Sequence, residues 1–87
     1  MFLHSWTVFE DITVCSYAMA RRTDPKSVSK LSLYLGISEN RIRYRLADFT
    51  KLVQGKKDWH YSRQERKVFD WLNRYATART LTITPTK

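Results

Sequence analysis

Apolar residues recur at helical intervals in four separate stretches of this chain. In the first stretch the spacings of four, three and four residues define one expected helix face: Val8, Ile12, Cys15 and Met19. Thr7 and Glu10 form a capping box before it, in which each side chain bonds the backbone N–H of the other residue. The pattern predicts a helix that begins after Thr7 and fades near Arg21 and Arg22.

A three-residue turn separates the second and third stretches. Asp24 and Pro25 open the second helix, because the first helical position does not use the N–H that proline lacks. Gly36 follows it as a left-handed C-cap, Ile37 packs under the turn, and Ser38 caps the third helix. The residues expected to face the core are Val28, Leu31 and Leu35 in the second helix and Ile42, Leu46 and Phe49 in the third.

A polar loop precedes the fourth stretch. Gly55 ends the third helix, and Ser62 with Glu65 forms a second capping box that opens the fourth. The expected inward stripe of the fourth helix is Val68, Trp71, Leu72 and Tyr75. This helix is predicted to end near Ala78, before a tail in which residues 80–84 alternate as in a strand.

These elements predict an all-α fold in a single domain, residues 1–87. The expected core is a tri-helical helix-turn-helix at about 6–53. An additional helix follows at about 62–78, and a flexible tail at 79–87.

The outer face of the third helix carries the candidate chemistry. A helical wheel places Asn40 and Tyr44 opposite the core face, with Arg41 and Arg43 beside them and Arg45 nearer the core edge. Guanidinium and amide groups pair with base edges in the DNA major groove. The expected base contacts are Asn40, Arg43, Tyr44 and Ala47. The expected phosphate contacts are Arg41, Lys51, Lys56, Lys57 and Arg63.

The spacing around Gly36 matches the helix-turn-helix pattern at most positions. The motif has apolar residues five and one positions before its turn glycine and one and six positions after it. This chain has an apolar residue at each of these positions around Gly36, and the small Ser32 lies where the two helices cross. The position nine after Gly36 is Arg45, where the pattern has an apolar residue, and Leu46 comes one later. The shift predicts a variant with a longer or rotated second helix of the motif.

The N-terminal segment Trp6-Thr7-Val8-Phe9-Glu10-Asp11, followed by Ile12 and Cys15, resembles the start of Myb/SANT-type repeats. The resemblance covers about residues 6–53. It implies a tri-helical fold whose third helix reads DNA, with the four expected base contacts facing the bases. Myb repeats have regularly spaced tryptophans, but the second and third helices of this chain have none. Only Tyr34 and Phe49 are candidates to take their places. SANT-type relatives often bind proteins, so a protein partner stays open.

Charge and composition favour a polyanionic partner. The net charge is +8, from sixteen Lys and Arg against eight Asp and Glu, although a solvated basic surface is the plain alternative. One cysteine excludes an internal disulfide, and no apolar run is long enough to span a membrane. The N-terminus is too short and uncharged for a signal peptide, so we expect a cytoplasmic protein, nucleoid-associated in bacteria or phage and nuclear in eukaryotes.

The sequence offers little to catalysis. Neither His4 nor His60 has a cysteine or carboxylate at metal-ligand spacing, and there is no phosphate-binding loop or nucleophile motif. We expect no enzyme activity, cofactor or metal. Trp59, His60 and Tyr61 can stack on an unpaired base, but the favoured expectation is that Trp59 folds back over the core and leaves His60 exposed.

Together these patterns predict a protein that binds duplex DNA sequence-specifically, as a small transcriptional regulator or a DNA-targeting protein. The alternative is a small helical protein–protein interaction module, or an inhibitor of phage or plasmid type, that uses the basic and aromatic surface. A further alternative is a homodimer through the fourth helix. Its interface would consist of Val68, Trp71 and Tyr75 if these side chains are not all buried in the core.

Overall fold

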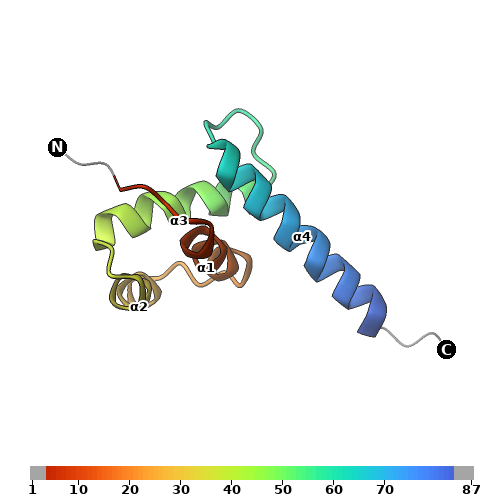
Figure 1. Ribbon diagram of the computed structural model, residues 1–87, viewed down its shortest axis with the longest axis horizontal. Helices are drawn as coiled ribbons and strands as arrows, with labels where there is room; N and C mark the ends of the chain where they lie inside the picture. The colour runs from red at the N-terminus through yellow and green to blue at the C-terminus, as the bar shows by residue number, and fades with distance from the viewer. Residues whose placement is uncertain (1–3, 84–87) are drawn as a thin grey trace.

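A computed structural model describes residues 4–83, and side chains as far as residue 76, as an all-helical protein. Its helices are α1 (Val8–Met19), α2 (Pro25–Leu35), α3 (Glu39–Val53) and α4 (Arg63–Ile83). α1 packs against α3 and α4, while α2 packs mainly on α3. The C-terminal half of α4 projects beyond the other three helices (Figure 1). The predicted all-α fold class is therefore confirmed.

α1 begins where the capping box predicts. Thr7 Oγ1 accepts from the Glu10 N–H at 3.1 Å, and Glu10 Oε1 accepts from the Thr7 N–H at 2.9 Å. The predicted core face of this helix is confirmed for Cys15, which is buried, and in part for Ile12 and Met19, which are half-buried against the core. The prediction was wrong for Val8, which is 53% exposed, and the buried face also includes Asp11, Val14 and Ala18. The face is rotated because a buried carboxylate, which an apolar pattern cannot detect, lies at its centre.

The turn between α2 and α3 has the predicted caps. Gly36 adopts the left-handed conformation at φ 69°. Ser32 Oγ donates to the Ile37 carbonyl oxygen at 2.6 Å, and Ile37 is buried beneath the turn. Ser38 caps α3 by accepting from the Arg41 N–H at 3.4 Å. These bonds fix the direction in which α3 leaves the turn.

The core lies between α1, α2 and the inner face of α3. Ile42, Leu46 and Phe49 are all buried, as predicted for the inner face of α3. Cys15 is buried among them, and this burial raises the pKa of its thiol to about 12. The thiol is therefore an apolar packing group and not a reactive one.

α4 differs from its prediction at both its inner face and its end. The second capping box is confirmed, because Ser62 Oγ accepts from the Glu65 N–H at 3.0 Å and Glu65 Oε1 from the Ser62 N–H at 2.8 Å. Of the expected stripe, Val68 is buried and Leu72 half-buried, whereas Trp71 and Tyr75 are 55% and 50% exposed.

The predicted end of α4 near Ala78 was wrong, since the helix continues to Ile83. The end of α4 occupies most of the segment that was expected to alternate like a strand. The expected flexible tail began at residue 79, and its residues 84–87 lie outside the described residues. None of the helices described is both long and apolar enough to cross a membrane.

Candidate nucleic-acid interface

The outer face of α3 presents all four residues that were expected to contact bases. Asn40, Arg43, Tyr44 and Ala47 are exposed and follow the i, i+3, i+4, i+7 spacing of a single helix face. Arg43 Nη1 donates to Asn40 Oδ1 at 2.9 Å, and Arg43 Nη2 lies 3.4 Å from a Glu39 carboxylate oxygen. Exposed bonds of this kind contribute only a few tenths of a kcal/mol, so they exchange readily for an external partner.

Arg45, which interrupts the helix-turn-helix pattern, points into the protein. Its Nε donates to Asp11 Oδ1 at 2.7 Å and its Nη2 to Asp11 Oδ2 at 2.8 Å, a bidentate pair. Gln64 Nε2 of α4 donates to Asp11 Oδ2 at 2.6 Å and to the Trp6 carbonyl oxygen at 2.8 Å. The Arg45 guanidinium also lies 5.0 Å from the centre of the Trp6 ring. Asp11 therefore links α1 to both α3 and α4.

A second buried carboxylate, Glu65, faces the other side of the guanidinium. Glu65 Oε2 lies 3.5 Å from Arg45 Nη1, and within the described part of the chain it is a buried side-chain oxygen that accepts no hydrogen bond. Burial raises the pKa of Glu65 to about 7, and Asp48 adds to the rise because a protonated Glu65 can donate to it. The Ser62 N–H and Arg45 oppose the rise without cancelling it.

This raised pKa predicts a stability that falls toward alkaline pH. Folding favours the protonated form of Glu65. The contribution of this group to the free energy of unfolding is therefore complete below about pH 4.5 and is lost as the pH rises through about 7. We expect urea unfolding of the native chain to show a loss of roughly 1–3 kcal/mol over this range from Glu65. Glu65→Gln removes the titration and should flatten the profile.

The matched control is Glu39→Gln, which makes the same change at an exposed position of α3. This control should keep the pH profile of the native chain. Identical profiles for Glu65→Gln and the native chain would show that Glu65 is not the group responsible.

The residues expected to contact phosphate do not form one surface. Arg41 lines a cavity of about 320 Å³ beside the outer face of α3, together with Tyr44. Lys56 and Lys57 line another, of about 290 Å³, in the loop before α4. The other residues around these cavities are His4, Trp6, Arg45 and Asp48 for the first, and Leu52, Tyr61 and Arg66 for the second. Arg63 lies elsewhere, beside α1 and α4.

Arg66 of α4 lines the same cavity as Lys56 and Lys57, although it was not among the expected phosphate contacts. Its guanidinium carbon lies 5.6 Å from the centre of the Tyr61 ring, and Tyr61 Oη donates to the Lys56 carbonyl oxygen at 2.6 Å. One sequence feature could have identified Arg66 as a candidate contact. The first turns of α4 contain an excess of cations, although the helix dipole disfavours positive charge there.

Trp59 folds back as predicted, but onto the surface of α3 and not over the core. Its indole N–H donates to Asp48 Oδ1 at 2.8 Å, and Lys51 Nζ lies 4.4 Å from the ring centre. Trp59 remains 41% exposed and His60 is exposed. Lys51 is thus engaged with an aromatic ring at the C-terminal end of the outer face.

Comparisons with family models, with curated proteins and with solved structures return no match for this chain.

Among the residues that are described, no group of three or more His, Cys, Asp or Glu side chains is placed to hold a metal ion.

Proposed function

We propose that this protein binds duplex DNA sequence-specifically through the outer face of α3, as a small transcriptional regulator or DNA-targeting protein. The observation that carries the proposal is the division of α3 into two faces. One face is buried through Ile42, Leu46 and Phe49, and the other presents an amide, a guanidinium and a phenol to solvent. A helix held rigidly by one face and polar on the other fits the B-DNA major groove.

The chemistry of the outer face supports readout of base edges. Arg43 offers the fork of N–H donors that pairs with guanine O6 and N7, and Asn40 offers the donor and acceptor that pair with adenine. Tyr44, which is 77% exposed, adds a hydroxyl and an apolar ring edge. The resemblance of the chain to Myb/SANT-type repeats gives the same helix this role.

Cations on both sides of this face supply the phosphate contacts in the proposal. Arg41 lies beside Tyr44, and Lys56 and Lys57 of the loop after α3 share a cavity with Arg66 of α4. Each neutralised phosphate releases about 0.9 of a counterion from duplex DNA. Several such contacts make binding strongly dependent on salt.

The test is fluorescence anisotropy on duplex DNA, first with random sequence and then with a site selected from a random pool. Affinity should fall roughly tenfold or more for each fourfold rise in salt. Arg43→Ala should cost about 1–3 kcal/mol on the selected site and much less on random duplex, because Arg43 reads a base in the proposal.

Arg74→Ala is the matched control, since Arg74 is exposed on α4 and pairs with Asp70 away from α3. It should leave affinity for both DNAs close to that of the native chain. Lys57→Ala should weaken both DNAs equally and flatten the salt slope by about one unit. Equal losses from Arg43→Ala on both DNAs would remove Arg43 from base readout, and no binding at low salt would refute the proposed function.

A further inference from the structure

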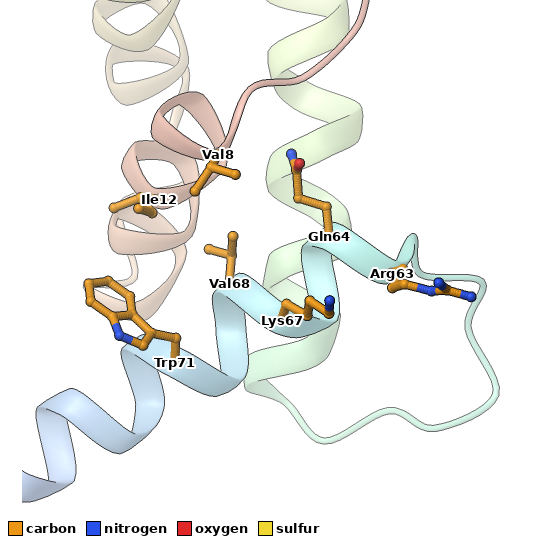
Figure 2. A pocket seen from close by; sticks show the side chains of 7 residues that line it. All are labelled: Val8, Ile12, Arg63, Gln64, Lys67, Val68 and Trp71. Carbon is orange, nitrogen blue, oxygen red and sulfur yellow. The ribbon is translucent and has the colours of Figure 1, made fainter.

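An apolar groove runs between α1 and α4. Val8 and Ile12 of α1 face Val68 and Trp71 of α4 across it, and the groove encloses about 640 Å³ (Figure 2). Val8 and Trp71 are each more than half exposed, although both are large apolar side chains. Exposed apolar surface of this kind, bordered by polar side chains, is typical of interaction sites.

The groove is separate from the proposed DNA surface. All of its lining residues belong to α1 and α4 and none to α3: Val8, Ile12, Arg63, Gln64, Lys67, Val68 and Trp71. In Figure 2, α3 lies beside α1 and passes behind α4. An occupant of the groove therefore leaves the outer face of α3 accessible.

The charges around the groove specify an acidic occupant. Lys67 borders it, the Arg63 guanidinium extends away from it on the far side of α4 (Figure 2), and no carboxylate is among the lining residues. A second copy of this chain brings the same cations and a net charge of +8, so like charges oppose self-association. Nucleic acid has the required charge, but the walls formed by Val8, Ile12 and Val68 are apolar, and a phosphate backbone gives them no apolar surface to pack against.

The walls also determine the shape of the occupant. Both are helices whose backbone N–H and C=O groups are already bonded within the helix, so an added β-strand finds no edge to pair with. Contact must come from side chains, as when an amphipathic helix lies in a groove. A helix laid along the groove would cover both Val8 and Trp71, the exposed apolar side chains on its two walls.

We propose that the α1–α4 groove binds an acidic amphipathic helix of a partner protein. Its apolar side chains, spaced i, i+3 or i+4, and i+7, insert between Val8, Val68 and Trp71. Its carboxylates face Lys67. Trp71 is the central anchor, because buried tryptophans contribute disproportionately to binding at protein interfaces.

The test uses a dye-labelled peptide of about 15 residues, with leucines along one helical face and glutamates elsewhere, titrated with the full chain in fluorescence anisotropy. We expect micromolar affinity. A peptide of the same composition with its leucines scrambled off one face should bind at least tenfold more weakly. A version with lysine in place of glutamate should not bind. These controls separate groove binding from general attraction to a basic protein.

Two pairs of variants locate the site on the protein. Trp71→Ala should weaken the peptide about tenfold or more, whereas Tyr34→Ala, at an aromatic of α2 that is 69% exposed, should not. Lys67→Glu should weaken it several-fold, whereas Lys30→Glu, the same change at an exposed position of α2, should have a much smaller effect. Lys67 is exposed, so Lys67→Glu is expected to keep the fold.

Several outcomes would overturn the proposal. These are equal binding of the scrambled peptide, equal affinities of each variant and its control, or no binding at all. Sedimentation of the chain alone as a dimer that Trp71→Ala dissociates would assign the groove to a second copy instead. The Trp71→Ala chain should keep the affinity of the native chain for duplex DNA, so this proposal and the DNA proposal fail independently.

Discussion

Replacing Asp11 with alanine is expected to lower the free energy of unfolding by about 3–5 kcal/mol, because it removes the bidentate partner of the buried Arg45 guanidinium. Asp11 is fully buried and accepts both hydrogen bonds of the bidentate pair with Arg45, whose side chain is only 14% exposed. Gln64 loses the same acceptor. Native domains are stable by only about 5–15 kcal/mol, so a loss of this size unfolds a large fraction of a small domain.

The measurement is urea unfolding followed by circular dichroism, with Asp70→Ala as the matched control. Asp70 also pairs with an arginine, Arg74, but both side chains are more than half exposed. Exposed pairs contribute about 0.2–1 kcal/mol, so the control should change stability little. Similar small losses in both variants would show that Asp11 does not organise the packing of α1 against α3 and α4.

The elements with local signals could be predicted from the sequence. The two capping boxes, the glycine C-cap at Gly36 and the inner face of α3 each depend on residues within one or two helical turns. Ser and Thr caps act through bonds to the backbone three residues later, so their pattern is visible along the chain. These features place α3 after its turn and expose its outer face.

The buried ion pairs could not be predicted, because their partners are distant in sequence. Asp11 looks like a favourable charge in the first turn of a helix, and Arg45 like a departure from an apolar pattern. Only the fold brings them together, 34 positions apart. Placing Asp11 at the centre of the buried face then rotates α1, which explains why Val8 is exposed and Val14 buried.

The misplaced residues of α4 have a different cause. Trp71 and Tyr75 follow the helical spacing of a buried stripe, and that pattern normally indicates burial. α4 extends beyond α1 (Figure 1), and Trp71 and Tyr75 are 55% and 50% exposed. The two rings instead stack on each other at 5.9 Å between centres. Periodicity predicts which residues share a face, but not how far the opposing helix reaches.

Replacing Leu46 with alanine is expected to lower the free energy of unfolding by about 2–5 kcal/mol, because it opens a cavity in the core. Leu46 is only 3% exposed and shares the inner face of α3 with Ile42 and Phe49. Leu33→Ala is the matched control, since Leu33 on α2 is 84% exposed and should change stability by about 0.5 kcal/mol or less. Chemical denaturation of both variants measures the difference. A loss below about 1 kcal/mol for Leu46→Ala would mean that α3 is rotated from this position, and the base-facing roles proposed for Asn40 and Arg43 would then be wrong as well.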